Sequence, residues 1–307
     1  MIGAHNKTFI TIIFFFSQYV LMHAQEKTSL LVVNAKIYSM NKYEDVHQAM
    51  AINGDRIVAV GASEELKKKY DAENILDAKG AFIFPGFIDA HGHLFGLGKA
   101  RMQLDLRGTK SAQEVATIVK KNLRKFPKGA WIQGRGWDQN DWQKKTFPDY
   151  TTLDAVTKDF PIFLKRIDGH AAWANSLAMQ LCGIDASTPD TAGGKILRDA
   201  SGNPTGIFID NAVDIIQNRI PEMDDTTMED AYRLAISECL RYGLTSVHDM
   251  GVKKENIRVM KRMIENGNFP FRVYAMIDGI IPEWQDLLKT GKQIYGDKQL
   301  ILAGVKL

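Results

Sequence analysis

The stretch Phe82-Ile83-Phe84-Pro85-Gly86-Phe87-Ile88-Asp89-Ala90-His91-Gly92-His93 joins an apolar run to two histidines that one glycine separates. Its composition predicts a buried strand over 82–90, and side chains two residues apart on a strand point to the same face. We therefore expect His91 and His93 to project together, because Gly92 adds no side chain between them. Two imidazoles just past a buried strand are typical of a divalent-metal site in a barrel enzyme. The alternative is two ordinary polar residues in a loop.

Composition and charge exclude some classes of protein. The chain has 307 residues, of which 45% are hydrophobic and 24% are charged, as in ordinary globular proteins. Its length suits one large domain or two smaller ones. The formal net charge is only +3, and the densest basic run, Lys67-Lys68-Lys69, is best explained as a solvated helix face. No basic stripe is interleaved with aromatic residues, so we expect no nucleic-acid partner.

Residues 1–24 predict a secretory signal peptide. Lys7 precedes an apolar core that begins at Phe9, and the small residue Ala24 stands before the polar Gln25. The apolar segment is short and polar-marked for a membrane span. We therefore expect an exported protein, periplasmic or secreted, with no stable membrane association after cleavage. An uncleaved N-terminal anchor is the alternative.

The chain has two cysteines, Cys182 and Cys239. An exported protein could pair them, but two cysteines do not establish a disulfide framework. Two buried free thiols are the simpler expectation.

The first part of the chain, before residue 81, predicts a small β unit. Strand-like runs at 29–38, 48–52 and 56–61 include a hairpin turn signal at Asn53-Gly54-Asp55. A short helix over 63–70 is expected to be capped by Ser63. This unit needs further strands to complete its sheet.

The middle of the chain mixes strands and helices. Strands are predicted at 130–138 and 161–167, and Ser111 is expected to cap the helix that follows it. A helix is expected through 171–181, and 193–210 predicts a hairpin that stands off the main core.

The last third alternates regularly. Helices are predicted at 227–241, 253–266 and 282–290, and strands at 244–249, 271–277 and 300–307. Such alternation with short links predicts a parallel sheet. With histidines at a strand end, the α/β fold expected is a closed (β/α)8 TIM barrel. An open doubly wound sheet is the alternative, but no GxGxxG helix start supports it.

Polar residues gather where these strands end. They are His91, His93, Asp168, His170, His248, Asp249, Asp278 and Lys306, and they include four of the seven histidines. Such a rim suits metal-assisted hydrolysis, because a bound divalent ion lowers the pKa of its water from about 15.7 toward about 7. Two imidazoles are too few ligands, since a catalytic site uses about three. A carboxylated Lys306 could supply another, although by position a lysine in solvent is equally expected.

A family resemblance follows from these motifs. Residues 84–93 resemble the first-strand motif of the amidohydrolase superfamily. The rest is similar to its amidohydrolase-3, YtcJ-like branch, which includes N-substituted formamide deformylase-like proteins. The matching segments lie at 134–138, 168–176, 193–206 and 243–249.

The resemblance implies a metal-dependent hydrolase of carbon–nitrogen bonds other than peptide bonds, acting on a small amide-type or formamide-type molecule. It implies a barrel over 81–307 with lid-like insertions near 107–160 and 186–210, and a β-sandwich part at 25–80. His91, His93 and Lys306 would bind one or two divalent ions, with zinc expected from the imidazole ligands. A homodimer stays open.

The resemblance also implies roles on the substrate side. Trp137, Asp138, Asp168 and Asn175 would line it, and His170 or His248 would hold the developing oxyanion. Chains of this family continue past Val305-Lys306-Leu307, where further histidines and a catalytic aspartate are expected. We therefore expect this chain to be the front part of such an enzyme, with an incomplete barrel and site. The alternative is a non-catalytic periplasmic binding or interaction protein that retains the front half of the barrel.

Overall fold

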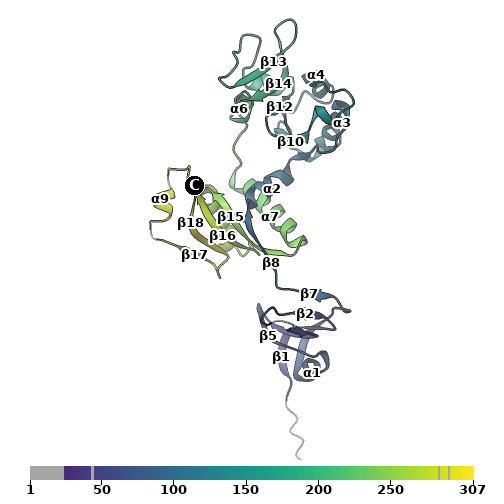
Figure 1. Cartoon of the computed structure of the whole chain (residues 1–307), viewed down its shortest axis with the longest axis vertical. Coiled ribbons are helices and arrows are strands. Elements are labelled where there is room, and N and C mark those ends of the chain that lie inside the picture. The colour runs from purple at the N-terminus through teal and green to yellow at the C-terminus, as the bar shows by residue number, and fades with distance from the viewer. Residues whose placement is uncertain (1–23, 43–44, 283, 290) are drawn as a thin grey trace, which may run out of the picture. The chain divides into compact units, whose positions relative to one another are not determined.

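The computed structural model describes residues 24–42, 45–282, 284–289 and 291–307. The predicted signal peptide at 1–24 lies outside these residues apart from Ala24. The chain divides into two compact units, Met1–Pro85 and Gly86–Leu307, which can be followed by their colours in Figure 1. None of the helices in the described ranges has the length and apolar character needed to cross a membrane.

The first unit is a small two-sheet sandwich. It contains β1 (Glu26–Val33), β2 (Lys36–Tyr38), β3 (Val46–His47), β4 (Ala49–Asn53), β5 (Arg56–Gly61), α1 (Ser63–Lys69), β6 (Tyr70–Asp77) and β7 (Phe82–Ile83). One sheet has the order β5-β4-β1-β6 and the other β3-β2-β7. Leu31 and Leu66 pack together on the face that α1 covers, whereas Val32 packs with Ile37 on the opposite face. The expected β-sandwich is confirmed.

The start of α1 differs from the prediction. Ser63 does not cap the helix, because the N-cap is Ala62 and no side chain caps it. The Ser63 hydroxyl instead accepts the Asn34 N–H at 2.9 Å and donates to the Gln48 carbonyl at 3.3 Å. Its oxygen is therefore used to join the helix to the neighbouring strands.

The second unit begins with a six-stranded sheet of order β13-β14-β12-β11-β10-β9. Its strands are β9 (Leu104–Asp105), β10 (Ile132–Trp137), β11 (Ile162–Arg166), β12 (Ala171–Ala174), β13 (Gly194–Arg198) and β14 (Pro204–Asp210). The accompanying helices are α3 (Ala112–Asn122), η1 (Leu123–Lys125), η2 (Gln139–Asp141), α4 (Tyr150–Asp154), α5 (Ser176–Leu181) and α6 (Val213–Gln217). The first three strands are parallel, and the remaining pairs are antiparallel.

One predicted helix in this sheet is wrong. Residues 171–174 were expected to begin a helix, but they form β12, and α5 starts only at Ser176. All four residues of β12 are buried between β11 and β14, so packing on both sides decides their conformation. The predicted cap of α3 is confirmed, since the Ser111 side chain accepts the Glu114 N–H at 3.1 Å.

The second sheet of this unit has the order β17-β18-β16-β15-β8. It contains β8 (Phe87–Gly92), β15 (Leu244–Val252), β16 (Arg272–Asp278), β17 (Gln293–Tyr295) and β18 (Leu300–Lys306). Its helices are α2 (Leu94–Met102), α7 (Asp225–Arg241), α8 (Lys254–Glu265) and α9 (Trp284–Leu287). Four strands run parallel, as the alternating pattern predicts, and the unpredicted β17 pairs antiparallel with β18.

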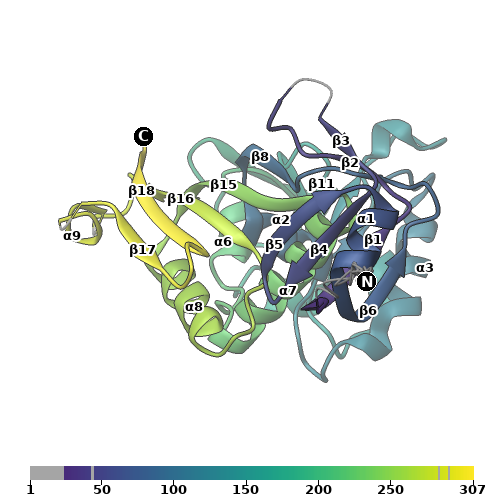
Figure 2. The ribbon, with the colours of Figure 1, turned by 90° about the horizontal axis from the view of Figure 1, so that it is seen from below.

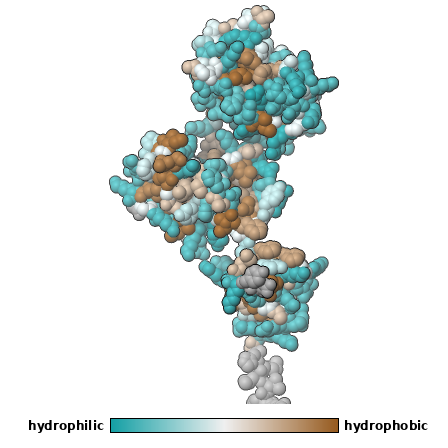
Figure 3. All heavy atoms as spheres, viewed as in Figure 1, coloured by the Kyte–Doolittle hydropathy of each residue, from teal (hydrophilic) through white to brown (hydrophobic). Residues whose placement is uncertain are grey.

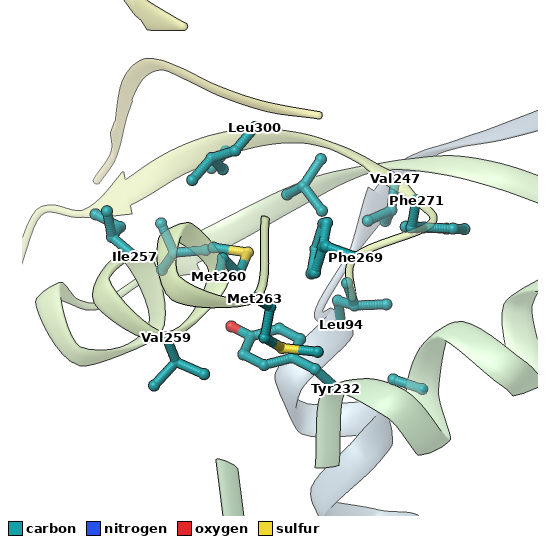
Figure 4. Packing of buried hydrophobic residues seen from close by; sticks show 14 of the residues in the cluster. Leu94, Tyr232, Val247, Ile257, Val259, Met260, Met263, Phe269, Phe271 and Leu300 are labelled. Carbon is teal, nitrogen blue, oxygen red and sulfur yellow. The ribbon is translucent and has the colours of Figure 1, made fainter. Parts of the chain in front are cut away.

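Helices cover one face of this sheet. Asp224 caps α7 by accepting the Thr227 N–H at 2.7 Å, and apolar side chains recur along α7 at helical spacing. Tyr232 from α7 packs with Phe269 and with Met260 from α8 under the strands (Figures 2 and 4). On β16, alternate residues from Val273 are buried against these helices, so the residues between them face the other side, which we call the open face.

The strand β8 differs from its prediction. It was expected to be buried, but Phe87 is 57% exposed and Ile88 is 60% exposed. Among the described strands β8 pairs only with β15, at the edge of the sheet. Apolar side chains such as these therefore reach the surface between polar ones (Figure 3).

Each ladder between the parallel strands loses its regular register toward the carboxyl ends. The shifts lie between Val247 and Asp249 opposite β8, between Met250 and Val252 opposite β16, and between Ala275 and Met276 opposite β18. A bulge of this kind changes which side chain points to which face. Cys182 and Cys239 are both free thiols in the structure, as expected.

Candidate functional site

The structure places the candidate site residues in two separate groups. His91, His93, His248 and Lys306 lie at or near the carboxyl ends of the parallel strands β8, β15 and β18. The remaining candidates lie on the six-stranded sheet. We describe the two groups in turn, beginning with the strand ends.

His91 and His93 are neighbours across the junction of β8 and α2. The strand ends at Gly92, and His93 is the N-cap of the helix, with backbone angles that are neither helical nor extended. The two ring centroids lie 5.8 Å apart and the rings are nearly perpendicular, at 87°. A zinc ion at about 2 Å from one nitrogen of each ring would place the centroids about 5 Å apart. The observed spacing is thus close to what a shared metal requires.

Gly92 has a second role that the sequence did not indicate. A Cβ atom at this position would lie 2.7 Å from Cγ2 of Val247 on β15. The glycine therefore allows the close approach of the two strands where the histidines begin.

Asp249 lies behind the two histidines and is almost fully buried. Its register partner on β8 is Gly92, and its carboxylate accepts the N–H of Leu94, the first residue of α2, at 3.3 Å. Burial raises the pKa of Asp249 to about 6, although the Leu94 N–H and the nearby His93 act in the opposite direction. The sequence listed Asp249 at a strand end but did not assign it a role, because its burial depends on packing between distant segments.

The open face carries further polar residues. His248 and Tyr274 are register partners on β15 and β16, and their ring centroids lie 4.9 Å apart. Asp278 and Lys306 are partners at the ends of β16 and β18, where the lysine is exposed. Its ammonium lies 3.3 Å from the carbonyl oxygen of Leu307.

The donor set for a metal is partial in the described residues, where no cluster of three or more histidine, cysteine or carboxylate side chains could hold an ion. Lys306 lies three strands away from His91, or about 14 Å along a flat sheet with strands about 4.8 Å apart. Curvature of the sheet, as in a barrel, is what would bring such side chains together. The imidazole pair fits a metal by type and spacing, and the lysine remains a prediction.

Asp168 and His170 form the second group. They were expected at the carboxyl end of a barrel strand, but they lie in the turn between the antiparallel strands β11 and β12. Arg166 donates to both carboxylate oxygens of Asp168, at 3.0 and 2.7 Å, and the His170 N–H donates to the same carboxylate at 3.0 Å. These bonds hold the pKa of Asp168 below its usual range, with the Arg166 bond contributing most.

Trp137 and Asn175 were expected to line the substrate side, but the structure buries both completely. The Trp137 indole N–H donates to the Leu164 carbonyl at 2.8 Å. Asn175 caps α5 and also accepts the Ile162 N–H at 2.9 Å. Both side chains are satisfied inside the core, so their contacts are structural.

Asp138 is half-buried and caps η2, where its carboxylate accepts the Asn140 N–H at 2.9 Å. The functional candidate that sequence reasoning missed is Asp210, whose Oδ1 lies 2.8 Å from Nδ1 of His170. The two residues are 40 positions apart, and only the pairing of β12 with β14 brings them together.

Comparisons with known proteins agree with this fold. The sequence profile of the amidohydrolase family matches residues 74–307. The chain is 34% identical over 264 residues to YtcJ of Bacillus subtilis (strain 168), covering 82% of this chain and 49% of that protein. It is 31% identical over 258 residues to the N-substituted formamide deformylase of Arthrobacter pascens, covering 81% of this chain and 47% of that protein. The chain thus spans about half the length of the curated relatives it matches.

Solved structures extend the comparison. An uncharacterised metal-dependent hydrolase from Pyrococcus horikoshii OT3 is 28% identical and superposes with a TM-score of 0.66, over 90% of this chain and 53% of that one. A second one, from Pyrococcus furiosus, is 27% identical with a TM-score of 0.65 over 90% of this chain and 55% of that one. The two mixed α/β sheets are therefore those of the amidohydrolase-type fold, and the resemblance seen in the motifs is confirmed. The chain belongs to the amidohydrolase family.

Proposed function

We propose that this chain is part of a metal-dependent hydrolase of carbon–nitrogen bonds other than peptide bonds. Its substrate would be a small molecule with an amide-type or formamide-type bond. The proposal is supported by membership of the amidohydrolase family and by a relative that is named as a formamide deformylase. The two solved structures with the same fold are metal-dependent hydrolases by name.

The observation that carries the proposal is the pair of imidazoles at the end of β8. His91 and His93 would hold a divalent ion, and nitrogen ligands of this kind suit zinc. Lys306 would be a further ligand if it is carboxylated. When bound, such an ion lowers the pKa of a coordinated water and polarises a carbonyl oxygen.

The residues of the chain would then position the substrate. His248 lies on the open face beside Tyr274, where its ring can donate a hydrogen bond to the oxygen on which charge develops. Asp138 and Asp168 are the partly accessible polar candidates for binding the rest of the substrate. Asp249 would fix the histidine turn from behind through the N–H of Leu94.

Zinc binding by the 307-residue chain tests this proposal. We expect equilibrium dialysis to show one or two zinc ions per chain, and a His91→Ala/His93→Ala variant to lose at least one of them. His47→Ala is the matched control, because it removes an imidazole from β3 in the other unit and should leave zinc content unchanged. Circular dichroism would establish that all three proteins are folded. Folded protein whose zinc content does not change in the double variant would refute the assignment.

The same experiment separates the enzyme from a non-catalytic binding protein. A binding protein that uses this fold without the chemistry would unfold cooperatively, bind no zinc and fail to hydrolyse N-substituted formamides. Hydrolysis that depends on zinc and on the His91–His93 pair would exclude that alternative.

We also propose that the protein is exported, on the basis of the signal-like residues 1–24. Expression in a bacterium with an outer membrane should yield periplasmic protein that begins at Gln25. Protein that stays in the cytoplasm with its first 24 residues intact would contradict export.

A further inference from the structure

His170 and Asp210 form a side-chain pair at the end of the β12–β14 ladder. Nδ1 of His170 lies 2.8 Å from Oδ1 of Asp210, and the Asp210 N–H donates to the His170 carbonyl at 2.8 Å. The last register pair of the two strands is Ala171 with Ile209, so His170 and Asp210 occupy the next position outward. The two residues are therefore joined through both their main chains and their side chains.

The turn that carries His170 is also held from other directions. Arg135 on β10 donates to the Ile167 carbonyl at 2.9 Å. Asp168 accepts the His170 N–H while it is bound by Arg166. Together with Asp210, these contacts fix the turn from β10, from β11 and from β14, so the histidine is mounted on a rigid support.

Asp210 adopts a backbone conformation that is uncommon for a residue with a side chain. Its φ is +46°, and such a conformation costs about 1 kcal/mol or more. Aspartate and asparagine tolerate it better than other residues because their short polar side chains bond locally. The unusual backbone therefore accompanies the orientation of the carboxylate toward His170.

The pair contributes little to the stability of the fold. The side chains of His170 and Asp210 are 71% and 49% exposed, and ion pairs at such sites contribute about 0–1 kcal/mol. What the pair does determine is which ring nitrogen carries the proton. An ionised carboxylate only accepts hydrogen bonds, so Nδ1 must be the protonated nitrogen of the neutral ring.

The other ring nitrogen is then the reactive one. No hydrogen bond to Nε2 of His170 is recorded within the ranges that the structure describes, and the ring is exposed. The Nδ1–H tautomer leaves a lone pair on Nε2, directed away from Asp210. A carboxylate that fixes the tautomer and orientation of an imidazole is a recurrent way to prepare it for proton transfer or metal binding.

We propose that Asp210 is the positioning residue of His170 and makes Nε2 a proton acceptor in the reaction. In the hydrolysis proposed above, on which this role rests, Nε2 takes a proton from the attacking water as its oxygen bonds to the carbonyl carbon. The imidazolium then returns that proton to the substrate nitrogen, which takes the electron pair of the breaking carbon–nitrogen bond and leaves as a neutral amine. Neutral His170 is thus a base at Nε2 and not the oxyanion donor that the sequence suggested.

The tautomer can be measured without metal or substrate. In ¹⁵N NMR spectra of histidine-labelled chain at a pH where His170 is neutral, we expect the Nδ1–H form to dominate. Asp210→Asn keeps the shape and tolerates the left-handed backbone, but its amide can donate or accept, so the Nδ1–H form should lose its dominance. Asp214→Asn, an exposed aspartate on α6, is the matched control and should leave the His170 signals unchanged. A dominant Nε2–H form in the wild type, or an unchanged spectrum in Asp210→Asn, would overturn the positioning role.

The kinetic role has its own test with the zinc-loaded chain and an N-substituted formamide. His170→Ala should lower kcat by about 10²–10⁴-fold, the usual contribution of a general acid–base group. Asp210→Asn should lower kcat by about tenfold or more with little change in KM. Rates equal to wild type in both variants would overturn the proton-transfer role and leave the proposed function standing. Absence of zinc binding and of hydrolysis in the wild type would refute the proposed function and with it the proton-transfer role, whereas the tautomer result would still decide the positioning of His170.

Discussion

Substituting Gly98 by alanine tests the contact between α2 and α7 that supports the histidine turn. A Cβ atom on Gly98 would lie 1.9 Å from the carbonyl oxygen of Ala231 and 2.5 Å from its carbonyl carbon. Carbon and oxygen atoms approach to about 3.3 Å at the closest favourable distance, so the helices would have to separate by more than about 1 Å. The obstacle is the backbone of α7, which cannot rotate away as a side chain can.

The expected cost combines two opposing effects. Inserting a methyl group into a packed contact costs about 1–3 kcal/mol. Replacing glycine by alanine inside a helix returns about 0.5–1 kcal/mol. We therefore expect Gly98→Ala to lower the free energy of unfolding by about 1–2 kcal/mol. Because His93 is the N-cap of α2, the shift of the helix should also weaken zinc binding.

Gly96 provides a matched control on the same helix. A Cβ atom there would meet only the Cβ of His93, at 3.5 Å, which is ordinary van der Waals contact, and the position is exposed. Gly96→Ala should therefore raise the free energy of unfolding by about 0.5–1 kcal/mol. Urea unfolding followed by tryptophan fluorescence would measure both variants. If Gly98→Ala were as stable as Gly96→Ala, the reasoning from the α2–α7 contact would be wrong.

Two further substitutions concern buried polar groups. Because burial raises the pKa of the Asp249 carboxyl to about 6, the folded metal-free protein holds this proton longer than the unfolded chain, and stability falls by about 3 kcal/mol as pH rises from about 4 to 6. Asp249→Asn keeps an acceptor for the Leu94 N–H but has no charge, so urea unfolding should show a flatter pH dependence and higher stability above pH 6; an unaltered slope would count against this. Asn175→Ala leaves the N–H groups of Ile162 and Ala178 without their acceptor in the core, and should cost about 2–5 kcal/mol in the same assay. A loss below about 1 kcal/mol would mean that water replaces the amide.

Much of the second sheet could be predicted because its signals are local. Helical spacing of apolar residues along 225–241, and short β-branched runs at 244–252 and 272–278, identify elements whose packing their own periodicity dictates. The histidines at 91 and 93 could be predicted as neighbours from their spacing alone. In these segments the local preference and the tertiary contacts agree.

The six-stranded sheet was harder to predict because contacts over long distances in the chain decide it. Ala171–Ala174 has helix-favouring composition, yet it forms a buried central strand because β11 and β14 pair with it on both sides. Trp137 has the same composition in a glycine-rich bend whether it faces solvent or core, and only the packing shows that it is buried. Asp210 became a candidate only through its pairing with a residue 40 positions away.

The register shifts near the carboxyl ends of the parallel strands also bear on how this sheet can change during evolution. Before the shifts, each ladder is regular, and a deletion of one residue would turn the buried side chains of a strand outward. Beyond them, as at Val252, an inserted or deleted residue can be accommodated by a bulge that already interrupts the ladder. Single-codon insertions and deletions should therefore be tolerated better in the last residues of β15 than in its first half. Length variation of this kind would exchange the side chains on the open face while the core under α7 and α8 stays unchanged.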